Sequence, residues 1–68
     1  MKVQFLLTMS GFDVMVEDLF LGSIDGNGFF ISPSTMKDFI RLSAEDLMEI
    51  ALKVEDVQKN DFRMAKFN

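Results

Sequence analysis

The chain has 68 residues and a formal net charge of −4, and it contains neither cysteine nor histidine. These absences exclude disulfide bonds and zinc sites of the usual cysteine and histidine type. The acidic balance argues against direct binding of nucleic acid, which needs a basic stripe, and against docking on an anionic membrane. No stretch reaches the ~18 apolar residues that cross a bilayer, so we expect a cytoplasmic protein.

The apolar content is high for so short a chain. Hydrophobic residues make up 49% of the sequence, including 8 Phe and 6 Met. A single domain over residues 1–68 buries about 60% of its unfolded surface, and its core supplies only about 3–5 kcal/mol. We therefore expect part of the apolar surface to remain outside, where a protein partner or a second copy covers it.

Strand patterns fill the beginning of the chain. In residues 2–9, apolar side chains alternate with more polar ones, which predicts a strand with one buried face. Residues 12–21 continue with a noisier alternation that is rich in β-branched and aromatic residues. The acidic pair Glu17-Asp18 interrupts this second pattern and predicts a bulge or a bend within it. A helix over 13–21 is the alternative, and the sequence leaves it open.

The strongest local signal is the run from Asp25 to Gly28. It contains Asp-Gly and Asn-Gly, the two dipeptides that type I′ hairpin turns prefer. The turn would join residues 19–24 to residues 29–31, giving an antiparallel meander with the first strand.

Helix signals fill the second half. Ser32 and Pro33 suit the start of a short helix that would run to Leu42. Ser43 is the natural N-cap of a second helix ending near Asn60, and Asp46 would complete its capping box. Its apolar stripe comprises Leu47, Ile50, Ala51, Val54 and Val57.

The predicted architecture is α+β, with a small three- or four-stranded antiparallel sheet packed on one face by two helices. The element order is βββαα. Residues 62–67 alternate enough to add a C-terminal edge strand, or they remain loose.

Catalysis is not expected. Without histidine and cysteine the chain lacks the best proton-transfer group near neutral pH and the thiol nucleophile. The adjacent carboxylate pairs Glu17-Asp18 and Glu45-Asp46 would diverge, on a strand or on a helix, and would not converge on one substrate atom. No cofactor is expected.

A metal site is not expected either. Residues 23–30 resemble part of an EF-hand calcium loop, with Asp25 and Asn27 in ligand positions. The resemblance fails because Ser23 and Ser34 stand where such a loop needs its first Asp and its bidentate Glu. A tight hairpin turn explains the same residues.

A protein-binding surface is the remaining expectation. Leu6, Leu19, Leu21 and Phe29 would fall on the sheet face that the helices leave uncovered, unless the helices or the tail cover them. The second helix would present carboxylates to solvent. The predicted partner-binding residues are Leu19, Leu21, Phe29, Phe30, Glu45, Glu49, Asp56, Phe62 and Phe67.

These features predict an inhibitor or adaptor that occludes a surface of one larger protein. Its size and acidity are typical of phage proteins that block a host enzyme or a defence complex. A self-assembling structural protein, such as a homodimer formed through an edge strand, is one alternative. A nucleic-acid mimic that uses the acidic helix face is the other.

Overall fold

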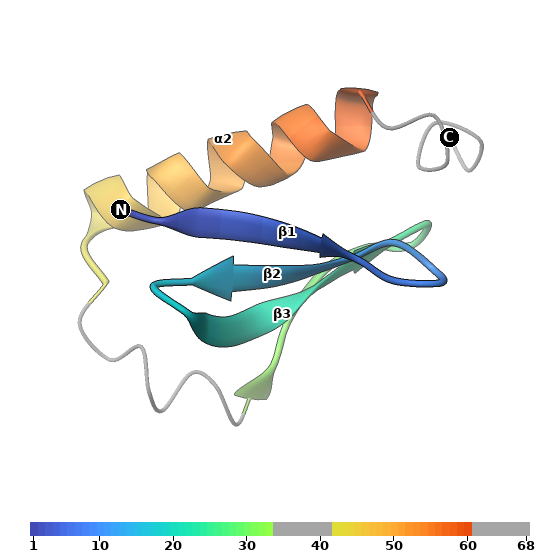
Figure 1. The fold of residues 1–68 in the computed structure, drawn as a ribbon. Coiled ribbons are helices and arrows are strands. Elements are labelled where there is room, and N and C mark those ends of the chain that lie inside the picture. Colours follow the sequence, from blue (N-terminus) through green and yellow to red (C-terminus); the bar gives the residue numbers. More distant parts are fainter. Residues whose placement is uncertain (34–41, 61–68) are drawn as a thin grey trace.

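A computed structural model describes residues 1–33 and 42–60 (Figure 1). The four strands follow one another in the antiparallel order β1-β2-β3-β4, and the helix α2 lies along one face of the sheet (Figure 1). This arrangement confirms the α+β class and the antiparallel sheet, but all four strands precede α2, whereas the fourth strand was expected at the C-terminal end of the chain. The elements are β1 (Val3–Leu7), β2 (Phe12–Val16), β3 (Leu19–Asp25), β4 (Gly28–Ile31) and α2 (Ala44–Asn60).

Residues 12–21 form two strands and not one, and no part of them is helical. Glu17 and Asp18 are the two central residues of a tight turn, with φ values of 51° and 67°. Positive φ at both positions is the signature of a type I′ turn, whose twist matches that of the flanking strands. The prediction of a bulge or bend inside a single strand is therefore wrong, because the chain reverses at this point.

This turn changes which side chains share a face. In a two-residue hairpin the residues on either side of the turn pair directly, so Val16 lies opposite Leu19. A continuous strand would have put Phe20 with Val16, whereas the observed register pairs Phe20 with Met15. The faces of β3 are thus the reverse of those expected from uninterrupted alternation.

A β-bulge then shifts the inward and outward alternation of β3 by one residue from Gly22 onward. Val14 pairs with Gly22 and Met15 pairs with Phe20, so Leu21 is an extra residue with no opposite partner on β2. Leu21 and Ile24 both reach the core as a result.

The hairpin at Asp25–Gly28 is confirmed, because Asp25 pairs with Gly28 across a two-residue loop. Its turn type is not the predicted one, since Gly28 is the only glycine with positive φ among residues 1–33 and 42–60 and Asn27 has a negative one. The Asp25 carboxylate accepts a hydrogen bond from the Asn27 backbone N–H at 2.7 Å, which fixes the turn locally.

The helix α2 begins and ends as predicted. The Asp46 N–H donates to Ser43 Oγ at 3.0 Å, and the Ser43 N–H donates to Asp46 Oδ2 at 3.4 Å, which confirms the capping box. At the other end the Asn60 side chain donates to the carbonyl oxygen of Asp56 at 2.8 Å. The first turn of α2 therefore has a side-chain cap for its unpaired N–H groups, and the last turn has a side-chain hydrogen bond to its backbone.

The core lies between α2 and the sheet face that α2 covers, here called the inner face. Ile50 and Val54 are the buried residues of α2, and they pack against the buried side chains of β2 and β3. The buried set is Val14, Val16, Leu21, Ile24, Ile50 and Val54, with Val3, Phe5, Phe29, Leu42 and Val57 packed around it.

Two predicted elements fall mostly outside the described residues. The short helix after Ser32 would occupy 34–41, and the edge strand over 62–67 falls within 61–68. The two-helix layer and the βββαα order are therefore not confirmed, since the described part of the chain contains four strands followed by one helix. No helix in this part is long and apolar enough to traverse a bilayer.

Gly22 is required by the close approach of β3 and β4. A methyl group at this position would collide with the carbonyl oxygen of Phe30, which is backbone and cannot move aside. We expect Gly22→Ala to lower the free energy of unfolding by ~3 kcal/mol, which leaves little stability in a chain of this size. Chemical denaturation would measure it, with Ser23→Ala on the same strand as the control. A cooperative transition unchanged in Gly22→Ala would contradict this packing.

The turn at Glu17-Asp18 can be tested by separating backbone strain from charge. Asp18→Asn and Asp18→Val both remove the charge, but only Val is strongly disfavoured at positive φ. We expect Asp18→Val to be less stable than Asp18→Asn by about 1–2 kcal/mol. Equal melting temperatures for the two variants would show that the turn does not hold residue 18 in this conformation.

Candidate functional site

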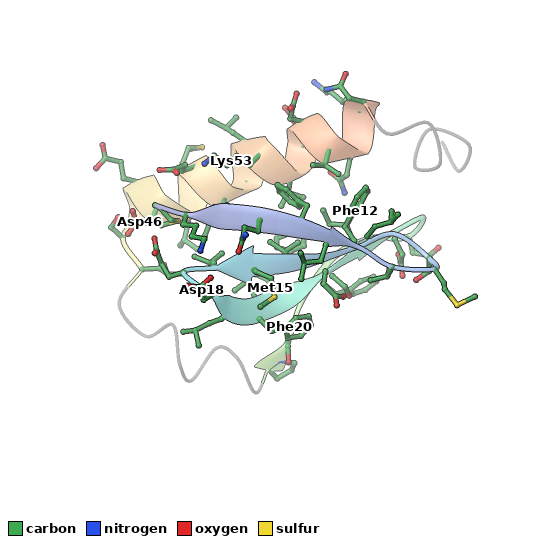
Figure 2. All side chains as sticks on the ribbon, viewed as in Figure 1. Phe12, Met15, Asp18, Phe20, Asp46 and Lys53 are labelled. Atoms are coloured by element: carbon green, nitrogen blue, oxygen red, sulfur yellow. The ribbon has the colours of Figure 1, made fainter. Side chains whose placement is uncertain are left out.

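The sheet face opposite α2, here called the outer face, carries side chains from all four strands. Because directly paired residues share a face, the register assigns them in two rows. One row contains Gln4, Met15 and Phe20, and the other contains Leu6, Asp13, Ser23 and Phe30. Met15 and Phe20, which are direct partners, lie together over β2 and β3 (Figure 2).

The large apolar side chains of the outer face remain in contact with solvent. Leu6 is 49% exposed, Phe20 41% and Phe30 53%, while Met15 is half-buried. Each of the four strands contributes one of these side chains. A group of large apolar residues on one rigid sheet face is typical of a surface that another molecule covers.

The structure divides the predicted apolar site residues between the two sheet faces. Phe29, which was expected on the uncovered face, packs against the core on the inner face, and its neighbour Phe30 lies on the outer face instead. Leu21 is only 2% exposed, so its expected place on the uncovered face is wrong. Leu19 is exposed but shares the inner-face side of its partner Val16. The reversal at Glu17-Asp18 is the physical reason for both differences.

The predicted acidic residues lie on α2, which covers the other side of the sheet from the outer face (Figure 1). Glu49 is paired with Lys53 at 3.1 Å, and Asp56 accepts a hydrogen bond from the Asn60 side chain at 2.8 Å. Glu45 is exposed to solvent. These carboxylates therefore do not join Phe30 in one site. Phe62 and Phe67 lie outside the described residues.

Sequence reasoning left Met15, Phe20 and Asp13 out of the site. The acidic pair Glu17-Asp18 was the available signal, because a two-residue turn at this point places Phe20 on the same sheet face as Met15. The signal was weak, since glutamate at the first central position is not a preferred type I′ residue and aspartate at the second is less favoured than glycine.

The solvent side of α2 has a smaller apolar patch. Met48 and Leu52 are exposed at i, i+4 and line a surface hollow together with Glu45, Asp46 and Glu49. Two side chains from one helix cover less area than the four-strand outer face, so we treat this patch as the control surface in the experiments below.

An apolar groove of about 410 Å³ separates β4 from the first half of α2. Ile31 and Leu42 both line the groove, and in the sequence they stand shortly before and directly after segment 34–41. Segment 34–41 includes three large apolar residues of its own. The groove is therefore assigned no external partner. Its lining residues are Leu21, Phe29, Ile31, Leu42, Leu47, Ile50 and Ala51.

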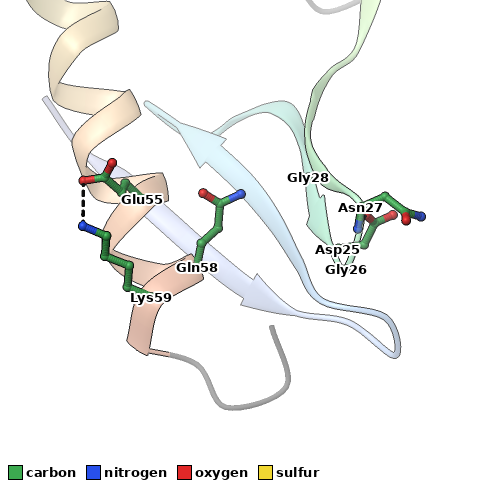
Figure 3. Close-up of a pocket in the computed structure, with 7 residues that line it drawn as sticks. All are labelled: Asp25, Gly26, Asn27, Gly28, Glu55, Gln58 and Lys59. Atoms are coloured by element: carbon green, nitrogen blue, oxygen red, sulfur yellow. Dashed lines mark hydrogen bonds and ion pairs between the residues drawn. The ribbon is translucent and has the colours of Figure 1, made fainter. Parts of the chain in front are cut away.

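A polar pocket of about 280 Å³ lies between the β3–β4 turn and the last turns of α2 (Figure 3). Its carboxylates are already engaged: Asp25 holds its own turn, and Glu55 pairs with Lys59 at 3.5 Å. Within residues 1–33 and 42–60, no three carboxylates gather closely enough to hold a metal ion.

Lys2 ties the start of β1 to the β2–β3 turn. Its ammonium group donates to Asp18 Oδ1 at 2.8 Å, and its backbone N–H donates to Glu17 Oε1 at 2.7 Å. The hydrogen bond to Asp18, followed by the charge of Asp18, raises the pKa of Lys2 above its ordinary value of 10.5. Any stabilisation from this pair is complete below pH 10.5 and is lost as the pH rises further.

Comparison of this chain with protein-family models, with curated proteins and with solved structures gives no match. The candidate function therefore has to be argued from the geometry of the outer face.

The two adjacent phenylalanines of β4 provide a test of the two faces. Phe29 packs against the core and Phe30 is exposed on the outer face. We expect Phe29→Ser to lower the free energy of unfolding by about 2–4 kcal/mol and Phe30→Ser to change it by less than ~1 kcal/mol. Thermal melting followed by circular dichroism would measure both. The reverse ranking would mean that α2 covers the other face.

Proposed function

We propose that this protein is a non-catalytic binding module that holds a larger protein against the outer face of its sheet. The observation that carries this proposal is the set Leu6, Phe20 and Phe30, three large apolar side chains that stay exposed on one side of the sheet. Exposing them costs solubility in a protein that acts alone, and covering them with a partner surface recovers the hydrophobic free energy.

The outer face is better suited to covering a surface of a partner protein than to catalysing a reaction. The outer face is built on backbone hydrogen bonds between four strands, so it is a firm platform rather than a cleft. The chain also has no histidine or cysteine to act on a bound substrate. We therefore place the protein among inhibitors or adaptors of the cytoplasm, the type that small acidic phage proteins exemplify.

Nucleic-acid mimicry is less well supported. It needs an array of unpaired carboxylates, yet two of the three predicted helix carboxylates have partners within α2 itself. Salt screening would also weaken such an array strongly, because its charges are exposed. Binding that survives high salt would agree with the apolar outer face and not with mimicry.

Charged substitutions on the two apolar surfaces test the proposal. Phe20→Asp and Phe30→Asp put a charge on the outer face, whereas Leu52→Asp puts one on the control surface of α2. Because buried aromatic anchors dominate interface energies, we expect each outer-face variant to reduce partner capture at least ~30-fold. The readout is the stoichiometric protein retained from a lysate of the native host by the immobilised chain, identified by mass spectrometry.

Wild-type chain and Leu52→Asp should retain the same protein in equal amounts. Loss of capture in Leu52→Asp alone would move the binding site to α2 and contradict the proposal. Recovery of the bait alone by the wild-type chain would contradict it as well. Circular dichroism of each variant separates loss of binding from loss of folding.

A further inference from the structure

Asp13 occupies a central position in the outer face. It pairs with Leu6 on β1 and with Ser23 on β3, and Ser23 in turn pairs with Phe30 on β4. The Asp13 carboxylate therefore lies next to Leu6 on one side, and Phe30 lies two strands away on the other side. Any partner that covers Leu6 and Phe30 together must also cover Asp13.

The Asp13 side chain is half-buried, and among residues 1–33 and 42–60 it has neither a hydrogen-bond nor an ion-pair partner. The three lysines of this part of the chain are engaged elsewhere: Lys2 with Asp18, and the two lysines of α2 with glutamates of the same helix. Within residues 1–33 and 42–60, solvation of this carboxylate is therefore left to water while the outer face is open.

A purely apolar partner would remove that water and replace it with nothing. The loss of solvation of a carboxylate opposes binding unless the partner supplies a hydrogen-bond donor, and a charged donor compensates best. We infer that Asp13 selects a partner whose apolar surface contains an arginine or lysine side chain, which pairs with this carboxylate at the centre of the outer face. This inference rests on the proposed function and names the chemistry of the partner.

The same feature argues against a second copy as the occupant. The two rows on the outer face of another copy contain only the neutral donors of Gln4 and Ser23, and Lys2, which follows Gln4 and Leu6 in the alternation of β1, is already paired with Asp18 of its own chain. It would also bring a second Asp13 and a net charge of −4 toward the first. A basic protein surface has the complementary charge and is attracted over a longer range.

Asp13→Asn provides the test, since it keeps the size and hydrogen-bonding oxygen but removes the charge. The probe is the host protein that the wild-type chain retains, purified and titrated by calorimetry against each variant. We expect Asp13→Asn to weaken binding about 10- to 100-fold, because a charge-assisted pair is lost and the partner's cation is left uncompensated. The affinity of the wild-type chain should fall modestly as salt rises, without binding being lost, because one ion pair is screened, and that of Asp13→Asn should depend on salt less.

The outcomes separate this inference from the proposed function. Loss of binding in Phe30→Asp with unchanged affinity in Asp13→Asn would overturn the role of Asp13 and leave the binding face intact. Unchanged affinity in both variants would overturn both. Sedimentation of the free chain provides a second readout: a stable dimer of the wild-type chain that Phe30→Asp dissociates would show that the occupant is another copy, and would overturn the inference.

Discussion

The tight reversal at Glu17-Asp18 is the constraint on which the rest of the structure depends. A two-residue turn pairs the residues that flank it, and this pairing decides which side chains of β3 meet α2 and which remain outside. Leu21 enters the core and Phe20 joins the outer face because of it. The turn uses two non-glycine residues with positive φ, a costly choice that persists because strand pairing and the contacts of Lys2 hold it.

One helix provides cover for one face of the sheet. The apolar stripe of α2 packs on the inner face, so the buried core combines Ile50 and Val54 with residues of β2 and β3. The outer face has no counterpart to α2 among the described residues. Its apolar side chains are therefore free to contribute to an interface, and they can do so without disturbing the core, since alternation separates the two sets along every strand.

Local signals in the sequence were sufficient for some elements and insufficient for others. The boundaries of α2 follow from Ser43 and from an apolar period that needs no tertiary information, so they could be predicted. The hairpin at Asp25–Gly28 could be predicted for the same reason, although not its turn type. The turn at Glu17-Asp18 could not, because Glu17 does not favour positive φ, the turn contains no glycine, and only strand pairing reveals it.

That single missed turn accounts for most of the difference between the predicted and the observed site. Leu21 was misplaced because its strand follows a hidden turn, and Phe29 was misplaced together with it, since the hairpin at Asp25–Gly28 fixes the pairing of β4 with β3 but not the face that α2 covers. The bulge at Leu21 added a second change of alternation that no local preference indicates. The setting of Asp13 depends on the register of three strands, so it emerges only from the folded structure.

The charge pattern explains how an exposed apolar face can be kept from associating with itself. Within the described part of the chain the lysines are paired with carboxylates at the β2–β3 turn and on α2, and Asp13 is the one charged residue in the two rows of the outer face. A carboxylate at the centre of an apolar surface opposes contact with an identical surface, because neither copy can neutralise the other. It favours contact with a surface that carries a cation. The same residue can thus limit self-association and define the partner, and a neutral side chain at position 13 would do neither.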